Sequence, residues 1–337
     1  MPLVKPHLCL MFNEKIKSVI KKYLRYDHTK LAIGIVYQGK TYTFSYSQKK
    51  EDDRVEDELY DIGSISKVFT SLLILEEVEE NKISLEDNID KYLLLQPGKY
   101  WAISDLLKHK CGFHHITPHQ FVVKSLLKSG YQRKNIYELI KRNDVIKEIN
   151  RRHKISKKTY GYSDFATAIL AILLEENNKK SFVRLMNDFI VSQFGLKNTQ
   201  CIKESTHRID SYIKNRKVLH WKWNSDNPYI AAGGIASTIS DMTSFIKQLI
   251  DRKDDGYIRL GFQIDNDDIK HNTTFFLNKR KTSYWHVGGV GTFRSSMIIS
   301  PKREMGVVVL GNQVGRREGN VHYLSKMIYT SLRRHKF

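Results

Sequence analysis

The stretch Ile62-Gly63-Ser64-Ile65-Ser66-Lys67-Val68-Phe69-Thr70 sets the interpretation of the whole chain. A Gly and a Ser precede an apolar run at helical spacing, which predicts a helix with Ser64 in its first turn, running to about residue 75. Residues three apart share a helix face, so Lys67 is expected beside the Ser64 hydroxyl. The positive end of the helix dipole would also favour an alkoxide there. A weak nucleophile beside a base at such a position is suited to acyl transfer.

The Ser-x-x-Lys spacing alone does not identify a catalytic pair. The same spacing begins at five other serines of this Lys-rich chain: Ser18, Ser47, Ser125, Ser211 and Ser244. A solvated helix face is the ordinary explanation for such a pair. The argument for Ser64 and Lys67 therefore depends on what else the chain contains.

Length and composition indicate an ordinary globular protein. The 337 residues are 41% hydrophobic, enough for one large domain or two small ones with a sizeable core. No apolar run approaches the roughly 20 residues that cross a bilayer. Residues 1–12 are too short and poorly flanked for a secretory signal. A cytoplasmic location is expected, with an exported form whose leader is absent as the alternative.

Cysteine and histidine usage indicates neither disulfides nor a metal site. The three cysteines are Cys9, Cys111 and Cys201. They are odd in number and widely spaced, so no disulfide framework is expected. No Cys or His pairs have the spacing of a zinc site, and His109, His114 and His115 are expected to lie at the surface of a loop. No cofactor is expected.

The chain is strongly basic. Its formal net charge is +20, from 56 Lys and Arg against 36 Asp and Glu. Basic clusters occur at Lys21-Lys22, Arg151-Arg152-His153-Lys154 and Arg333-Arg334-His335-Lys336. No recognised nucleic-acid-binding motif accompanies them, so no nucleic-acid partner is expected. A small-molecule or peptide substrate is expected, with an anionic ligand or surface as a possible further partner.

The order of elements predicts the fold class. Residues 31–37 and 41–46 flank a Gly turn and form a hairpin, followed by a charged loop at 51–57. Helical runs follow at 103–109, 136–149, 166–176 and 182–194, then β-type runs at 257–264, 273–278, 282–287, 295–300 and 305–310, and an amphipathic helix at 320–333. Strands from both ends of the chain would have to meet in one sheet.

This order predicts an α/β (α+β) fold, in which an antiparallel sheet is flanked by helices and carries an inserted all-helical domain. We expect residues 1–78 together with 232–337 to form the sheet domain. Residues 79–231 would form the inserted, mainly helical domain. The active site is expected at the junction of the two.

Two further clusters contain side chains suited to acyl transfer. Tyr160-Gly161-Tyr162-Ser163-Asp164 precedes an apolar helix, and Tyr162 and Asp164 flank a single residue, so both can point the same way. An anchoring aromatic is the ordinary explanation for Tyr162 alone. In Trp285-His286-Val287-Gly288-Gly289-Val290-Gly291, a His and small residues along a strand indicate an edge that a substrate backbone can approach. A lone His there is more often structural.

Together the three clusters resemble the active-site motifs of the serine β-lactamase and penicillin-binding-protein superfamily. They are most similar to its class C β-lactamase-like branch, which includes esterases and D-amino-acid peptidases. That branch has Ser-x-x-Lys, then Tyr-x-Asn, then a Lys-Thr-Gly or His-x-Gly strand. The matching residues here are Ser64 to Lys67, Tyr162-Ser163-Asp164 and His286-Val287-Gly288. The resemblance implies a β-lactamase/transpeptidase-like fold.

The segments between these motifs are similar to the branch as well. They are residues 81–93, 103–112, 194–199, 232–241 and 308–312. No single motif is specific, but six or more in register are. The resemblance therefore covers about residues 30–313.

The resemblance also implies roles for individual residues. Ser64 would be acylated, and Lys67 and Tyr162 would relay its proton. His286 would lie on the far side of Tyr162.

An oxyanion site is implied at the same place. The backbone N–H groups of Ser64 and Gly289 would hold the oxyanion. Side chains at Gly288 or Gly289 would crowd the acyl group. Asp164 is the remaining candidate for substrate binding.

Two residues depart from the pattern of the branch. Asp164 replaces the usual Asn, and a carboxylate beside Lys67 would favour the ammonium form, which leaves Tyr162 as the proton acceptor. Asp164 could instead turn away, or mark a weakened or repurposed site. His286 replaces Lys, which suits esterases and peptidases better than true β-lactamases, and no Glu-x-x-Leu-Asn deacylation motif is present.

The sequence thus predicts a serine acyl hydrolase that forms an acyl-enzyme on Ser64 and acts on an ester, an amide or a D-configured peptide. One alternative is an acyltransferase or peptide cyclase with the same acyl-enzyme. The other is a non-catalytic penicillin-binding-like protein that binds an anionic partner.

Overall fold

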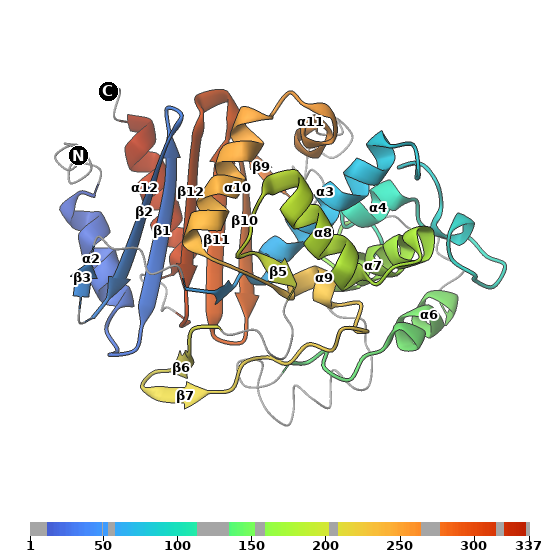
Figure 1. Ribbon diagram of the computed structural model, residues 1–337, viewed down its shortest axis with the longest axis horizontal. Coiled ribbons are helices and arrows are strands. Elements are labelled where there is room, and N and C mark those ends of the chain that lie inside the picture. The colour runs from blue at the N-terminus through green and yellow to red at the C-terminus, as the bar shows by residue number, and fades with distance from the viewer. Residues whose placement is uncertain are drawn as a thin grey trace.

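A seven-stranded antiparallel sheet is the frame of the protein (Figure 1). The computed structural model describes residues 12–48, 50–52, 58–112, 135–151, 159–201, 208–263, 277–314 and 320–334. The strands of the sheet are β1 (Lys30–Tyr37), β2 (Lys40–Ser47), β3 (Lys50–Asp52), β9 (Asn278–Arg280), β10 (Ser283–Val290), β11 (Phe293–Ser300) and β12 (Met305–Gly311). Their order across the sheet is β3-β2-β1-β12-β11-β10-β9.

The centre of the sheet joins the two ends of the chain. β1 pairs with β12 from Leu31 opposite Gly311 to Tyr37 opposite Met305. Both strands are apolar and buried along nearly their whole length, as expected where both faces of a sheet are covered. The predicted mixed fold, in which helices flank an antiparallel sheet, is confirmed.

Helices cover both faces of this sheet and create two apolar cores. The covering helices are α2 (Glu14–Tyr23) and α12 (Val321–Arg334) on one face, and α3 (Ser66–Glu79) and α10 (Ile239–Asp251) on the other. Alternate residues of β1 enter different cores: Ile33 and Ile35 pack with α2 and α12, whereas Ala32 and Val36 join the core that contains α3 and α10.

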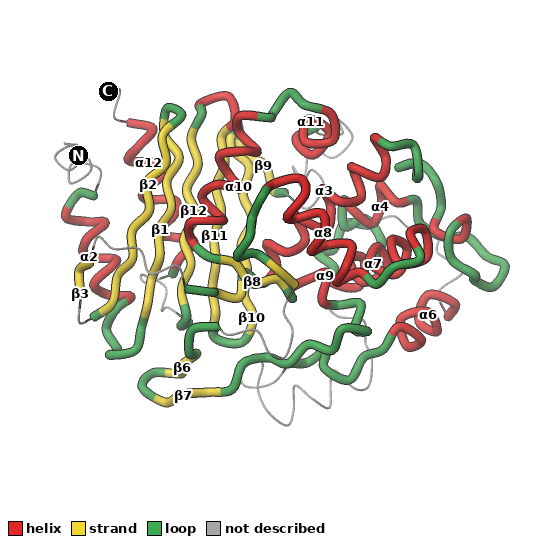
Figure 2. The backbone as a smooth tube through the Cα atoms, in the orientation of Figure 1, coloured by secondary structure: helices red, strands yellow, loops and turns green. Residues whose placement is uncertain are grey.

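Most of the remaining helices gather beside the sheet (Figure 2). They are α4 (Ile103–Leu107), α6 (Arg142–Arg151), α7 (Asp164–Asn178), α8 (Phe182–Phe194), α9 (Ile230–Gly233) and α11 (Gly256–Phe262). Serine caps begin two of them, because Ser163 accepts from the Ala166 N–H and Ser181 from the Arg184 N–H. The exact division into a sheet domain and an inserted domain stays a prediction. Within the described ranges, no helix is long and apolar enough to cross a membrane.

Short elements connect these layers near the site. They are the 3₁₀ turns η1 (Gly63–Ile65), η2 (Ile89–Lys91) and η3 (Pro301–Arg303), and the strands β4 (Tyr60–Asp61), β5 (Gln200–Cys201), β6 (Ser211–Ile213), β7 (Arg216–Val218) and β8 (Ile235–Ser237). β4 pairs with β8, with Tyr60 opposite Ser237. This pairing fixes the chain just before Ser64.

Three predictions of secondary structure differ from the structure. The predicted strand at 257–264 is wrong: α11 forms there, because Tyr257, Ile258 and Gly261 are buried at helical spacing, with Gly261 against α3. The predicted helix at 136–149 starts only at α6, and the predicted loop at 51–57 opens with the end of strand β3. Three other predicted features lie largely or wholly outside the described residues: most of the strand at 273–278, Cys9, and all of the Arg151-Arg152-His153-Lys154 cluster except Arg151.

Candidate active site

Ser64 lies in the turn η1, directly before α3. Every other residue of 60–75 is buried, whereas Ser64 is partly exposed. Gly63, which precedes it, has a φ of +53°, a conformation that glycine adopts without strain. The chain therefore presents this one hydroxyl to solvent at the N-terminal end of a buried helix.

Lys67 is fully buried and its ammonium group lies among several oxygen atoms. Its Nζ lies 3.1 Å from Ser64 Oγ and 2.7 Å from the Ala232 carbonyl oxygen. It also forms an ion pair with Asp164 Oδ1 at 2.6 Å. The Tyr162 phenol is also hydrogen-bonded to this lysine.

Asp164 does not turn away from the cluster. As the first residue of α7, it directs Oδ1 to Lys67, while its Oδ2 accepts a hydrogen bond from the Tyr137 phenol. Tyr137 is a site neighbour that the sequence analysis missed. It lies 27 residues before Asp164, outside every recognised motif, and no spacing signal marks it.

Tyr162 lies over the same lysine. The Lys67 Nζ is 5.1 Å from the Tyr162 ring centroid. Burial raises the pKa of the Tyr162 phenol; the charge of Lys67 works against this rise and that of Asp164 adds to it. The phenol is therefore protonated at neutral pH.

The pKa of Lys67 is also raised. Burial alone would lower it, but the Asp164 carboxylate and Tyr162 together outweigh that effect. At neutral pH the site thus holds an ammonium beside Ser64. This agrees with the expectation that a neighbouring carboxylate makes Lys67 a poorer base.

His109 contacts the Tyr162 loop through two hydrogen bonds and through its ring. It is 2% exposed, so its predicted place at the surface is wrong, whereas His114 and His115 lie outside the described residues. Its Nδ1 accepts from the Ser163 N–H at 3.1 Å and its carbonyl accepts from the Gly161 N–H at 2.8 Å. Its ring centroid is 4.6 Å from that of Tyr162.

The His286 ring lies near that of Tyr162, with ring centroids 6.1 Å apart. It is 1% exposed, and its Nδ1 is 2.8 Å from the Val287 carbonyl oxygen. Only a protonated Nδ1 can donate to a carbonyl, so Nε2 carries the lone pair, and it has no hydrogen-bond partner among the described residues. Burial, together with the charge of Lys67, lowers the pKa of His286 to about 3.

Backbone contacts join the Ser64 turn to β10. A Cβ atom added to Gly288 would lie 2.0 Å from the Ile62 carbonyl oxygen, and one added to Gly63 would lie 2.5 Å from the Gly289 nitrogen. Any side chain at Gly288 or Gly63 would push the two segments apart. The glycines therefore bring the backbone of Ser64 next to that of Gly289.

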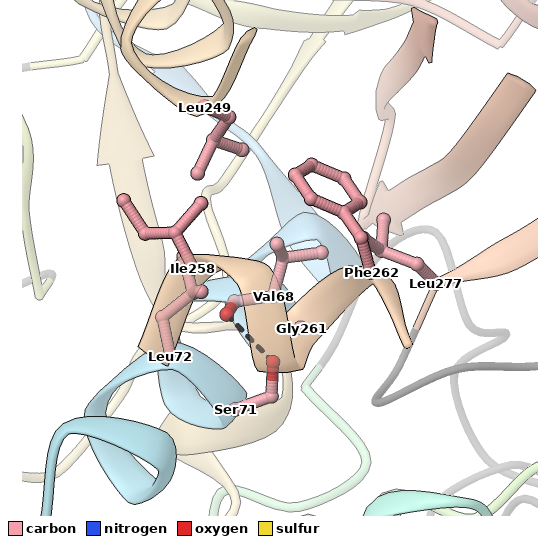
Figure 3. Close-up of a pocket in the computed structure, with 8 residues that line it drawn as sticks. All are labelled: Val68, Ser71, Leu72, Leu249, Ile258, Gly261, Phe262 and Leu277. Atoms are coloured by element: carbon pink, nitrogen blue, oxygen red, sulfur yellow. Dashed lines mark hydrogen bonds between the residues drawn. The ribbon is translucent and has the colours of Figure 1, made fainter. Parts of the chain in front are cut away.

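Two hollows of the protein lie away from these residues. The first, of about 10 Å³, is shown in Figure 3 and is lined by Val68, Ser71, Leu72, Leu249, Ile258, Gly261, Phe262 and Leu277. It is a packing gap between α3, α10 and α11, with room for about one water. A larger hollow of about 760 Å³ is lined by charged residues that include Lys30, Glu58 and Arg208. Neither contains a candidate site residue.

Among the described residues, possible metal ligands do not cluster and the cysteines are buried. No group of three or more His, Cys, Asp or Glu residues within the described ranges is arranged to hold a metal ion. Cys111 and Cys201 are buried free cysteines.

The fold and this cluster define a β-lactamase-like and penicillin-binding-protein-like protein. The sequence profile of the Beta-lactamase family matches residues 16–326. The chain therefore belongs to the Beta-lactamase family.

Solved structures agree with the fold. The octameric penicillin-binding protein homologue from Pyrococcus abyssi superimposes with a TM-score of 0.73 at 20% identity, covering 94% of this chain and 76% of that one. A class C β-lactamase from Rhodobacter sphaeroides gives a TM-score of 0.71 at 15% identity, covering 94% and 99%.

Characterised relatives are distant and longer. Protein flp of Staphylococcus aureus (strain MW2) is 21% identical over 94% of this chain. The teichoic acid D-alanine hydrolase of Staphylococcus aureus is 26% identical over 68% of it. The chain spans 65% and 56% of the lengths of these two relatives. Family membership and the hydrolase names support a serine acyl hydrolase in general terms.

Proposed function

We propose that this protein is a serine acyl hydrolase that forms an acyl-enzyme on Ser64 and acts on an ester, an amide or a D-configured peptide. One observation carries the proposal: the only residue of 60–75 that is not buried is a serine whose Oγ lies 3.1 Å from the buried Lys67 Nζ. A serine paired with a lysine at the start of a helix, next to the backbone of β10, is suited to nucleophilic catalysis.

The raised pKa values of Lys67 and Tyr162 favour a relay through the phenol. Ser64 Oγ attacks the acyl carbon and passes its proton to the Tyr162 oxygen. Tyr162 in turn gives its own proton to the leaving-group oxygen or nitrogen, so no free base is needed. The Lys67 ammonium stabilises the negative charge that passes between the two oxygens. In the second half of the reaction water replaces the leaving group, and the same relay runs in reverse.

The oxyanion would be held by the backbone N–H groups of Ser64 and Gly289. The close approach at Gly63 and Gly288 supports this assignment, because it brings the two backbones into contact. Each such donor contributes about 3 kcal/mol to transition-state stabilisation.

Asp164 limits which acyl groups the site can bind. A carboxylate has no N–H donor, unlike the Asn usual in the class C-like branch, so it cannot bind the carbonyl oxygen of an N-acylated substrate. An acyl group with a free amine suits a site with this carboxylate better. We propose a D-aminoacyl ester as the first substrate to test, and the D-alanine hydrolase relative supports this choice.

Exposed basic residues on one side of the protein support the proposal of an anionic partner. The exposed cations of α2 and α12 are Lys15, Lys17, Lys21, Lys22, Lys326, Arg333 and Arg334. Glu14 is the single acidic residue of these two helices, whose residues are all described. An ester carried on an anionic polymer would be attracted to this side of the protein. An exported protein would meet such polymers, whereas a cytoplasmic one would act on a metabolite or small peptide.

An active-site probe tests the proposal. A fluorophosphonate or fluorescent penicillin is expected to label the wild type and not Ser64→Ala. D-alanyl, L-alanyl and N-acetyl-D-alanyl esters then rank the acyl group, with the D-alanyl ester expected to turn over fastest. Adding an amine acceptor separates hydrolysis from acyl transfer or cyclisation. A wild type that neither labels nor turns over any ester would leave the non-catalytic, anion-binding alternative.

A further inference from the structure

Tyr137 binds the carboxylate oxygen of Asp164 that faces away from Lys67. Asp164 Oδ1 forms the ion pair with Lys67, and Oδ2 accepts the hydrogen bond of the Tyr137 phenol. Tyr137 is 5% exposed, so solvent does not compete for this contact. The carboxylate is therefore held from both ends.

Tyr137 is itself held rigidly by an aromatic cluster. Its ring stacks on Tyr229 with centroids 4.4 Å apart and planes 11° apart, and lies 6.4 Å from the rings of Trp221 and Trp223. Its backbone N–H donates to Asn135 Oδ1 at 2.9 Å, and its carbonyl accepts from Asn227 Nδ2 at 2.6 Å. The phenol thus has little freedom to leave Asp164.

The same cluster supports a second neighbour of the lysine. Tyr229 directly precedes α9, and Ala232 of that helix accepts from Lys67 at 2.7 Å. Two of the oxygens around the ammonium, those of Asp164 and Ala232, are therefore supported by one group of aromatic side chains. None of these aromatic residues belongs to a motif singled out in the sequence.

We propose that Tyr137 is a positioning residue that holds Asp164 against Lys67 and so keeps the lysine beside Ser64 charged. The contact requires a donor at Tyr137, because a carboxylate only accepts hydrogen bonds. An Asn at 164 that kept its oxygen on Lys67 would turn its NH₂ group towards the phenol, which would then have to accept. The donation by Tyr137 is thus specific to an Asp at this position.

Removing the phenol oxygen tests the idea. Tyr137→Phe keeps the stacked ring but leaves Oδ2 of Asp164 without its donor, so the carboxylate can turn away from Lys67. That movement reduces the negative charge next to Lys67. NMR of protein with ¹³C- and ¹⁵N-labelled lysine, assigned by the loss of one signal in Lys67→Arg, is expected to show Lys67 titrating at least roughly one pH unit lower in the variant. Identical titration curves would overturn the proposal.

Two further proteins separate positioning from simple damage. In an Asp164→Asn background, Tyr137→Phe is expected to leave the pKa of Lys67 unchanged. The labelling rate is expected to change by no more than about two-fold. Tyr23→Phe is the matched control, because Tyr23, the last residue of α2, is a similarly buried tyrosine whose phenol donates to the Gln313 carbonyl at 2.6 Å. It is expected to leave the titration unchanged.

These outcomes can be told apart from a failure of the proposed function. Only an effect of Tyr137 on catalysis rests on that function. A protein that hydrolyses nothing can still show the shifted titration of Lys67. Should Tyr137→Phe unfold, the same substitution is expected to be tolerated in Asp164→Asn, where no donor is needed. Unfolding in both backgrounds to the same extent would contradict the role assigned to Tyr137.

Discussion

Asp164 Oδ1 lies 2.6 Å from Lys67 Nζ, inside a site where the lysine has no exposed surface. A buried ion pair is costly to desolvate, and loss of one partner leaves an uncompensated charge. The pair therefore links the stability of the fold to the protonation of the group beside Ser64.

Asp164→Asn is expected to lower the stability and change the pH dependence. It removes the charge that raises the pKa of Lys67, so that burial, which lowers this pKa, dominates. The free energy of unfolding should fall by about 3 kcal/mol at neutral pH. The limb of the pH profile of Ser64 labelling that reports Lys67 should move to lower pH. Denaturant titration at neutral pH and labelling rates from pH 6 to above the ordinary lysine pKa of 10.5 measure both effects, and an unchanged limb would separate Asp164 from the chemistry.

Tyr162→Phe is expected to slow acylation more than it weakens ligand binding. The substitution removes the oxygen that relays the Ser64 proton but keeps a ring of the same size against His109. General acid–base groups typically contribute about 10²–10⁴-fold, so a loss of that order in the labelling rate is expected. Stopped-flow labelling gives the acylation rate and the probe affinity separately. Equal acylation rates in the variant and the wild type would remove Tyr162 from the mechanism.

The motif residues of the site were predictable from the sequence, whereas their support was not. Ser64 and Lys67 are three residues apart on one helical turn, so local geometry brings them together. Tyr162 and His286 could be added only through the family pattern, because no local rule connects positions a hundred residues apart.

The support depends on contacts that no local pattern encodes. Tyr137 reaches Asp164 from a segment without a motif, and the Ala232 carbonyl has no side chain that could mark it. The sheet was predictable because β1 and β12 are continuous apolar runs. The helix α11 was not, because Tyr257, Ile258 and Phe262 have high strand propensity and tertiary packing decided the outcome.

Gly288→Ala is expected to disrupt both the site and the fold. The new methyl group would lie 2.0 Å from the Ile62 carbonyl oxygen, so β10 must move away from the Ser64 turn. We expect a loss of about 1–3 kcal/mol in unfolding free energy and of about 10²-fold or more in labelling rate, because one oxyanion donor shifts.

Gly39→Ala is the matched control for this glycine. Gly39 has a φ of +74° but no heavy atom within 4 Å of an added Cβ. This substitution should lower the free energy of unfolding by only about 1 kcal/mol, through backbone strain, and leave the labelling rate unchanged. A Gly288→Ala protein that labels within two-fold of the wild type would contradict the close approach of β10 to Ser64.

His286 is expected to make the protein sensitive to acid. Its pKa is about 3 in the folded protein, against an ordinary value of 6.5, so between pH 6.5 and 3 the unfolded chain binds one more proton at this residue. The free energy of unfolding should therefore decrease as the pH falls through this window, by up to about 1.4 kcal/mol per pH unit. His286→Gln removes the titrating group and should flatten that slope by about one proton. His322, whose pKa burial lowers to about 4, is the matched control, since His322→Gln should flatten the slope only above pH 4. Denaturant unfolding at half-unit pH steps measures the three slopes, and a His286→Gln slope equal to that of the wild type would mean that the imidazole is not held neutral beside Tyr162.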